Sequence, residues 1–352
     1  MANKVLFILK RREDYCAFSH SNRMLSTGLY NSARLVQEML VDSGIDAEIE
    51  VAVDNNCIDR LVTQHRPTHV IIEALWVVPE KFVVLQRLHP GVKWIIRMHS
   101  ETPFIANEGI AMDWLLEYSG FKNVYLGINA PRFLDEIRAM VSIRNRWDKH
   151  TAAERVFYMP NFYPTDDFVT KPLDREKDHI DIGCFGAIRP LKNHLEQAIA
   201  AVRFAEDHSK MLRFHVNDGR IEMKGQPVVN NLKGLFEQLH ERGHEMIVHD
   251  WMPHDAFLKV CASMDLGLQV SFTETFNIVG ADIVSQGVPL IASTEIPWAA
   301  PGFCADPTNN RNIVKKLERA WSWPGMNTWQ NQRNIKNYSS NTRKIWVKLF
   351  KD

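Results

Sequence analysis

Residues 273–291 read TETFNIVGADIVSQGVPLI. The apolar run directly before them, at residues 266–270, is typical of a buried strand, and so is residues 289–292 near their end. Between these two strands we expect a helix that begins at Asn277. That helix places its exposed first amides beside Glu274, with Asp282 about two turns in. A strand, a helix and a second strand in this order form the repeating unit of a parallel α/β sheet.

The same alternation of short apolar strands and helices runs outward through the whole chain. Residues 161–177, with two prolines and mixed charge, are interpreted as a linker between two halves. We therefore predict an α/β fold with a Rossmann-like domain at residues 1–165, a second at 166–325, and a C-terminal helix at 326–352 that returns to the first. The predicted strands are residues 5–9, 47–53, 69–73, 94–98, 180–188, 212–216, 245–249, 266–270 and 289–292. The predicted helices are residues 32–40, 79–88, 193–206, 230–241, 255–263, 313–321 and 329–350.

The composition is that of an ordinary globular protein of two domains. The chain has 352 residues, of which 45% are hydrophobic and 24% are charged, and these values exclude disordered and fibrous proteins. Because 42 basic residues balance 42 acidic ones, no overall field attracts nucleic acid or anionic lipid. Any polyanion must be bound by a local cluster of charges.

The cysteines and the hydropathy pattern favour a reducing compartment. Five widely spaced cysteines, without a Cys-x-x-Cys pair, are typical of free thiols. The apolar run at residues 5–9 is too short for the core of a signal peptide, and the chain has no uncharged apolar stretch of 18 residues. We expect a cytoplasmic protein without a membrane-spanning segment.

Polar side chains follow several of the predicted strands. In an open parallel sheet, ligands bind beyond the carboxyl ends of the strands, so these positions are candidates for a site. His99 follows the strand at residues 94–98, and Glu274 follows the strand at residues 266–270. Arg189 and Lys192 come after Gly186 and directly before a predicted helix, which is the arrangement expected where cations and helix amides hold a diphosphate.

At this point the sequence resembles a known family. Residues 273–291 are similar to the signature of retaining nucleotide-sugar glycosyltransferases of glycosyltransferase family 4, in which two glutamates with seven residues between them precede an apolar helix and Gly-x-Pro. Residues 186–193 resemble the diphosphate segment of that family, and Pro160-Asn161 resembles its interdomain strand end. The resemblance implies a GT-B fold, with two Rossmann-like domains facing an interdomain cleft. Two departures are Asp282 in place of the second glutamate and Asn277 in place of a glycine.

The resemblance implies a role for each matching residue. Arg189 and Lys192 neutralise the leaving nucleoside diphosphate, and Glu274 contacts the transferred sugar. His99 resembles a histidine that faces this sugar, and it completes the implied catalytic set. Trp251 either stacks on the nucleobase or packs as an ordinary aromatic residue. The implied donor-binding residues are Gly28, Gly186, Thr275, Phe276, Asn277, Asp282, which contacts the ribose, and Trp251.

The acceptor is assigned to the first half of the chain. Arg97, Glu101 and Asn161 are the residues that we expect to contact it, and the loops at residues 11–25 and 102–113 are expected to choose it. The opening stretches VLFILKRREDY (residues 5–15) and STGLYNSA (residues 26–33) are similar to glycosyltransferases of large tailed phages. The acceptor is therefore either a glycan or lipid-linked glycan, or a hydroxymethylated DNA base in the cytoplasm of an infected host.

The sequence predicts no metal site. No two aspartates lie two positions apart, so the Asp-x-Asp site of the other major glycosyltransferase fold is missing. Residues 240–244 match the zinc motif His-Glu-x-x-His, but Gly243 is expected to end the helix and to turn His244 away from it.

The expected reaction is a metal-independent transfer of a sugar, with retention of configuration, from a UDP- or GDP-linked donor to an acceptor hydroxyl. The nucleotide-sugar is a co-substrate, and no cofactor is expected. The alternatives are a sugar-nucleotide epimerase or hydrolase on the same scaffold, and a non-catalytic nucleotide-sugar-binding subunit. Nothing in the sequence indicates the oligomeric state.

Overall fold

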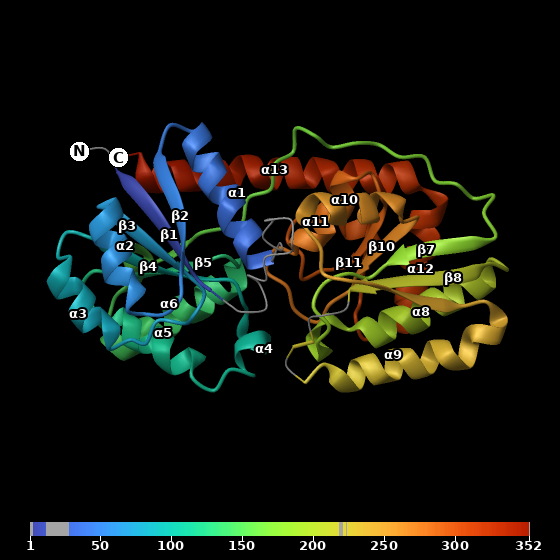
Figure 1. Ribbon diagram of the computed structural model, residues 1–352, viewed down its shortest axis with the longest axis horizontal. Helices are drawn as coiled ribbons and strands as arrows, with labels where there is room; N and C mark the ends of the chain where they lie inside the picture. The colour runs from blue at the N-terminus through green and yellow to red at the C-terminus, as the bar shows by residue number, and fades with distance from the viewer. Residues whose placement is uncertain (1–2, 12–27, 218–220, 223, 352) are drawn as a thin grey trace. The chain divides into compact units, whose positions relative to one another are not determined.

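The computed structural model describes residues 3–11, 28–217, 221–222 and 224–351. The chain divides into two compact units: unit 1 comprises residues 1–163 and 339–352, and unit 2 comprises residues 164–338. Each unit is a six-stranded sheet whose strands are all parallel, with helices packed on the sheet (Figure 1). The predicted α/β fold of two Rossmann-like domains is confirmed.

Unit 1 has the strand order β2-β1-β3-β4-β5-β6. Its strands are β1 (Lys4–Lys10), β2 (Asp46–Ala52), β3 (His69–Glu73), β4 (Lys93–Met98), β5 (Val124–Ile128) and β6 (Val156–Tyr158). Its helices are α1 (Gly28–Asp42), α2 (Cys57–His65), α3 (Lys81–Leu88), α4 (Thr102–Ile105), α5 (Ala111–Ser119), α6 (Pro131–Asn145) and α7 (Lys149–Arg155).

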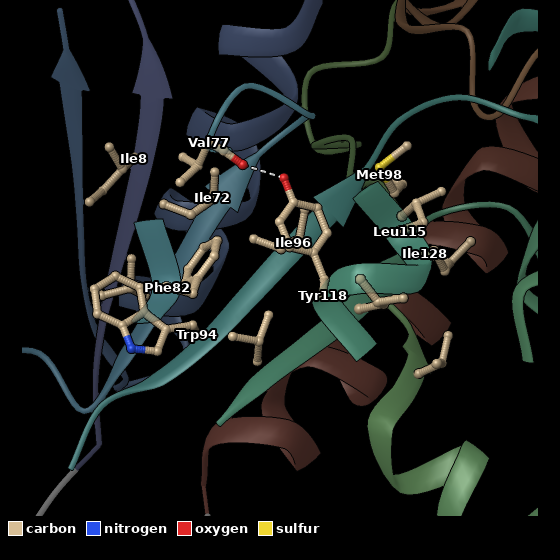
Figure 2. Packing of buried hydrophobic residues seen from close by; sticks show 14 of the residues in the cluster. Ile8, Ile72, Val77, Phe82, Trp94, Ile96, Met98, Leu115, Tyr118 and Ile128 are labelled. Carbon is tan, nitrogen blue, oxygen red and sulfur yellow. Dashed lines mark hydrogen bonds between the residues drawn. The ribbon is translucent and has the colours of Figure 1, made fainter. Parts of the chain in front are cut away.

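Aromatic residues fill the core of unit 1 between β4, α3 and α5 (Figure 2). The ring of Phe82 meets Trp94 and Tyr118 edge to face, with centroids 5.8 and 5.6 Å apart. The hydroxyl of Tyr118 donates a hydrogen bond to the carbonyl of Val77, which satisfies the one polar atom of this ring. All five residues of β3 are buried, as expected for a parallel strand covered on both faces.

Unit 2 has the strand order β12-β11-β10-β7-β8-β9. Its strands are β7 (His179–Gly183), β8 (Met211–Asn217), β9 (Glu245–His249), β10 (Leu266–Gln269), β11 (Leu290–Ser293) and β12 (Cys304–Ala305). Its α-helices are α8 (His194–Asp207), α9 (Gln226–Leu239), α10 (His254–Ser263), α11 (Ile278–Ser285), α12 (Asn310–Ser322) and α13 (Pro324–Phe350). The described residues of unit 2 also form the 3₁₀ helices η2 (Pro190–Lys192), η3 (His240–Arg242) and η4 (Pro301–Phe303).

Helix α13 belongs to both units, because unit 2 ends at residue 338 and the residues after it belong to unit 1. In unit 2, the side-chain amide of Asn327 donates to the carbonyl of Leu290 and accepts from its amide, at 2.9 and 2.8 Å. In unit 1, the indole of Trp346 donates to the carbonyl of Pro160 at 2.8 Å. The first turns of the helix therefore pack with unit 2, and only the last turns pack with unit 1.

Some strands differ from the sequence prediction. The strands β5, β6 and β12 were not predicted, and the predicted strand at residues 180–188 ends at Gly183. It ends there because the chain turns away, with Gly186 at a φ of +112° and Ile188 paired with Ile221 in an isolated bridge. Among the helices of the described residues, none has the length and apolarity that a membrane crossing requires.

Candidate functional site

Unit 2 brings a lysine and a glutamate together at the carboxyl end of its sheet. Nζ of Lys192 lies 2.5 Å from Oε1 of Glu274, and their side chains are only 12% and 8% exposed. Lys192 follows β7 and Glu274 follows β10, and these two strands are neighbours in the sheet. The amide of Phe272 also donates to the carbonyl of Leu191 at 3.0 Å, so the two loops are joined through their backbones.

Lys192 is held in place by the start of α8. Asn193 adopts a left-handed conformation with a φ of +59°, and its side-chain amide donates to the carbonyls of Val270 and Pro307 at 3.1 and 2.8 Å. Nε2 of Gln197 donates to the carbonyl of Lys192, and Oε1 of the same side chain accepts from the backbone amide of Val270. The residues around Lys192 thus fasten the end of β10 to the first turn of α8, which fixes the backbone that carries the lysine.

Glu274 is held by the start of α11. Asn277 has a φ of +61°, a conformation that asparagine tolerates better than most residues, and its Oδ1 accepts from the amide of Gly280 at 2.7 Å. Its Nδ2 donates to Oε1 of Gln269 at 2.8 Å. Phe276 is buried, and its carbonyl accepts from the indole of Trp298 at 2.7 Å. The asparagine that departs from the family pattern therefore serves as the helix cap.

Arg189 and Gly186 lie in the loop that follows β7. Nη1 of Arg189 is 3.3 Å from Oε2 of Glu222. The amide of Gly186 donates to Oδ1 of Asn217, at the end of β8, at 2.9 Å. The positive φ of Gly186 is the kind of turn that glycine allows. Two cations, Arg189 and Lys192, therefore occupy one loop at the edge of the sheet.

Asp282, the residue expected at the ribose, pairs with a histidine. Its side chain is 3% exposed, and its Oδ1 lies 2.9 Å from Nε2 of His254, the first residue of α10. The side chain of His254 is 18% exposed, so the carboxylate of Asp282 is the more buried partner of this pair. Trp251 is half-buried in the loop between β9 and α10. Thr275 lies between Glu274 and Phe276 and is half-buried.

Unit 1 carries a buried charged cluster at the carboxyl end of its own sheet. Glu73 ends β3 and is completely buried; its Oε1 accepts from Nη1 of Arg97 at 3.0 Å, and its Oε2 accepts from Nε2 of His99. Burial opposes ionisation of Glu73, but the charges of Arg97 and His99 and their hydrogen bonds keep its pKa below its ordinary value. Glu73 is therefore ionised at neutral pH.

His99 has both ring nitrogens engaged. While Nε2 donates to Glu73, Nδ1 lies 3.5 Å from Nδ2 of Asn129, which follows β5. Burial lowers the pKa of His99, Glu73 opposes this change and Arg97 adds to it, so the ring is neutral at pH 7. With no lone pair free, this ring is poorly suited to act as a general base.

Arg97 corrects one expectation for the acceptor. Its side chain is fully buried; Nη2 donates to Oδ1 of Asn161 at 2.7 Å, and the guanidinium lies over the ring of Trp346, 5.0 Å from its centroid. Arg97 therefore contributes to the cluster as a buried partner of Glu73 and Asn161, and it has no exposed surface for an acceptor to contact. Asn161 is buried in the same cluster, and its Nδ2 donates to Oγ of Ser32 at 3.2 Å.

The remaining residues expected in unit 1 lie apart from this cluster or outside the described residues. Glu101 is 6% exposed and pairs with Arg132 of α6. Gly28 is the first residue of α1. In the expected acceptor loop at residues 11–25, all but Arg11 lie outside the described residues, as do residues 26 and 27 beside Gly28.

In the part of the chain that the structure describes, no three His, Cys, Asp or Glu side chains gather into a set that can hold a metal ion. The motif at residues 240–244 is not a helical zinc site. It forms a 3₁₀ turn that Gly243 ends with a φ of +81°, and His244 pairs with Glu206 at 2.7 Å and accepts from the amide of Leu212. The expected termination at Gly243 is confirmed.

Comparison with known proteins gives matches in structure alone. No protein-family model matches the sequence, and no curated protein matches it. An α,α-trehalose-phosphate synthase (UDP-forming) from Burkholderia vietnamiensis aligns with 100% of this chain and 97% of its own, at a TM-score of 0.73 and 10% identity. A sucrose-phosphate synthase from Thermosynechococcus elongatus aligns with 99% of this chain and 98% of its own, at a TM-score of 0.68 and 12% identity. A trehalose-6-phosphate structure from E. coli bound with UDP-2-fluoro glucose aligns over 99% of both chains, at a TM-score of 0.67 and 12% identity.

This chain has the GT-B fold. At such low identity, the similarity establishes the architecture of the two units. It does not assign the role of any residue in those proteins to a residue of this chain. Within the fold, sequence reasoning named both members of the Lys192–Glu274 pair but missed Glu73 and His254. The available signal for Glu73 was its place at the end of a buried strand, the same position that drew attention to His99.

Proposed function

We propose that this protein is a retaining glycosyltransferase that transfers a sugar from a UDP- or GDP-linked donor to an acceptor hydroxyl without a metal ion. The observation that carries the proposal is the Lys192–Glu274 pair at the carboxyl end of the unit 2 sheet, with Arg189 in the same loop. The fold supports it, because the structures similar to this chain include a UDP-forming synthase and a structure bound with UDP-2-fluoro glucose.

The chemistry follows from the charges of this pair. Cleavage of the bond between sugar and diphosphate leaves negative charge on the diphosphate and positive charge on the sugar carbon. Lys192 and Arg189 stabilise the first as fixed cations. When Lys192 turns from Glu274 to the diphosphate, the carboxylate of Glu274 becomes available to the hydroxyls of the sugar. Donor binding thus gives Lys192 the diphosphate in place of Glu274, and Glu274 accepts hydrogen bonds from the sugar hydroxyls in place of Lys192.

Retention is proposed to follow the route of the resembled glycosyltransferase family 4. The acceptor hydroxyl attacks the face from which the diphosphate departs, and a diphosphate oxygen takes the proton. This route needs no basic side chain, which agrees with the engaged nitrogens of His99. His99 and its cluster are then proposed to contribute to sugar binding by shape and polarity.

The acceptor is proposed to be a hydroxyl of a carbohydrate, free or lipid-linked. Trehalose- and sucrose-phosphate synthases share the fold, and their names describe products that are carbohydrates. The resemblance of the opening stretches to tailed-phage enzymes supports a second acceptor, a hydroxymethylated base of DNA. In both cases we propose that the reaction takes place in the cytoplasm, of the infected host in the phage case.

The test compares two variants, each of which replaces one lysine by glutamine. Lys192→Gln retains a hydrogen-bond donor for Glu274 but removes the charge, while Lys233→Gln removes a charge from an exposed position on α9. We expect UDP- or GDP-sugars to raise the melting temperature of the wild type and of Lys233→Gln, and we expect the transfer rate of Lys192→Gln to fall by about 100-fold or more.

Transfer is assayed with glycans and with hydroxymethylated DNA, in the presence of EDTA, and the anomeric configuration of the product is read by NMR. Equal activity of the two variants, an inverted product or inactivation by EDTA contradicts the proposal. Conversion of the donor without an acceptor indicates an epimerase or hydrolase. Binding without turnover on every acceptor indicates a non-catalytic subunit.

A further inference from the structure

Three side chains form a hydrogen-bonded row across neighbouring strands of unit 2. Oδ1 of Asp181 on β7 lies 3.1 Å from Nε2 of His215 on β8. Nδ1 of His215 lies 2.8 Å from Nε2 of His249, the last residue of β9. The two imidazole rings are nearly parallel, with centroids 5.1 Å apart. The row thus begins inside the sheet and ends at its carboxyl edge.

The inner end of the row is a fixed acceptor. Burial opposes ionisation of Asp181, but the hydrogen bond from His215 and the charges of His215, His179 and Lys177 lower its pKa to about 2. The ionised carboxylate only accepts hydrogen bonds, so Nε2 of His215 carries a proton and donates it. Lys177 holds the carboxylate from the other side, at 3.3 Å, and also binds Asp265 at 2.9 Å.

The protons of the row then follow from one another. A neutral imidazole has one donor and one acceptor nitrogen. Because Nε2 of His215 donates to Asp181, its Nδ1 accepts and Nε2 of His249 donates. Burial and the neighbouring ring of His215 also lower the pKa of His249, which keeps this ring neutral. The remaining nitrogen, Nδ1 of His249, is therefore a hydrogen-bond acceptor.

This last atom is open to a ligand. Within the described residues, Nδ1 of His249 has no hydrogen-bond partner, and it does not belong to their buried unpartnered atoms. His249 itself is half-buried. Asp181 and His215 hold this nitrogen in its acceptor state, but no described residue donates a hydrogen bond to it. A donor group on a ligand can therefore bind there.

The surroundings of His249 suit a flat ring. Its ring meets that of Phe185 edge to face at 5.9 Å, and Phe185 meets Phe257 in the same way at 5.3 Å. Trp251 follows in the next loop and, like Phe257, is half-buried. In α10, only Cys261 is fully buried, so the remaining apolar residues of this helix keep part of their surface open.

The distance to the phosphate-binding loop also fits. Arg189 and Lys192 follow β7, and β9 is two strands away in the order β7-β8-β9. With strands spaced about 4.8 Å apart, the end of β9 lies roughly 10 Å from the end of β7. A nucleoside diphosphate can span this distance, with its base at the end of β9 and its diphosphate at the loop after β7.

We propose that His249 is the residue that selects the nucleobase of the donor, by accepting the ring N–H of uracil or guanine on Nδ1. Uracil and guanine each carry a ring N–H on the edge used for base pairing, whereas cytosine and adenine present a bare ring nitrogen there. Asp181 and His215 are positioning residues that fix the acceptor state of His249. The inference rests on the proposed function, because it assigns a part of the same donor.

The first test needs no variant. At pH 8, the dissociation constants of UDP, N3-methyl-UDP, CDP, GDP, N1-methyl-GDP and ADP are measured on the wild type by calorimetry. We expect UDP or GDP to bind about tenfold or more tightly than its methylated form, because methylation leaves the acceptor nitrogen unpaired. Equal affinity for UDP and N3-methyl-UDP, together with equal affinity for GDP and N1-methyl-GDP, overturns the inference.

The second test uses variants of His249 with a control at Lys192. In His249→Phe we expect the preference over the methylated nucleotide to fall to within about twofold, while His249→Gln, whose carbonyl accepts a hydrogen bond, retains part of it. Lys192→Gln is expected to weaken all nucleotides and inorganic pyrophosphate alike and to leave the preference unchanged. A packing role for His249 predicts instead that both His249 variants keep the full preference. Failure of every nucleotide to bind the wild type refutes the proposed function, and with it this inference; binding without the expected preference refutes the inference alone.

Discussion

At the scale of single residues, burial decides the protonation of two histidines. His69 begins β3, and burial together with the charge of Lys93 lowers its pKa to about 4. His194 begins α8, and burial with the charges of Lys192 and Arg189 lowers its pKa to about 3. In the unfolded chain, both rings have the ordinary value near 6.5. The unfolded state therefore binds protons that the folded state does not, and stability falls as the pH falls from about 6.5 toward 4.

This linkage predicts an acid-sensitive fold. At pH 5, a histidine with a folded pKa well below 5 costs about 2 kcal/mol relative to neutral pH, because each pH unit below 6.5 costs about 1.4 kcal/mol. His194→Gln does not titrate, so we expect its free energy of unfolding to fall less between pH 7 and pH 5 than that of the wild type. Urea denaturation at pH 7, 6 and 5 measures the difference. Parallel pH profiles for the two proteins show that His194 does not carry this proton linkage.

At the scale of elements, the start of α11 is determined by one residue. Asn277 provides both a side-chain cap for the amide of Gly280 and a backbone with a φ of +61°. Asn277→Gly loses the cap but tolerates the φ, whereas Asn277→Ala loses the cap and also strains the backbone. We expect the alanine variant to be less stable than the glycine variant by about 1 kcal/mol, and both to be less stable than the wild type. Urea midpoints measure the order. Equal stability of the two variants contradicts the role of the left-handed conformation.

The elements also show what the sequence predicts and what it does not. The strand, helix and strand around residues 273–291 are predicted because an apolar run of four or five residues and a capping asparagine leave a local signal. The strands β6 and β12 have three and two residues, too few for a pattern. The proximity of Lys192 and Glu274 follows from the general rule that strand ends meet at one edge of a sheet. The pair formed by Asp282 and His254 depends on how α10 packs on α11, which no local pattern contains.

At the scale of the whole molecule, the end of the chain stabilises a cluster that lies far from it in sequence. Trp346 of α13 is completely buried in unit 1, and its ring lies beneath the guanidinium of Arg97. Arg97 in turn holds Glu73, the partner of His99. The last turns of α13 thus contact the polar cluster of unit 1, while Lys192 and Glu274, the proposed donor residues, lie wholly in unit 2.

This division predicts that one substitution separates donor binding from transfer. Trp346→Ala leaves Arg97 without its aromatic support and is expected to cost unit 1 about 3–5 kcal/mol. Trp346→Phe keeps an aromatic ring there and loses the hydrogen bond to Pro160, so it is the matched control.

At a temperature where Trp346→Ala remains folded, as judged by circular dichroism, we expect its affinity for the nucleoside diphosphate to stay within about twofold of the wild type, because Lys192 and Glu274 are unchanged. We expect its rate of transfer to fall by about tenfold or more, because the cluster around His99 loses its geometry. Calorimetry and a transfer assay measure the two quantities on the same preparation. A parallel loss of affinity and rate indicates that the two units do not act separately, and an unchanged rate indicates that the Glu73–Arg97–His99 cluster has no part in transfer.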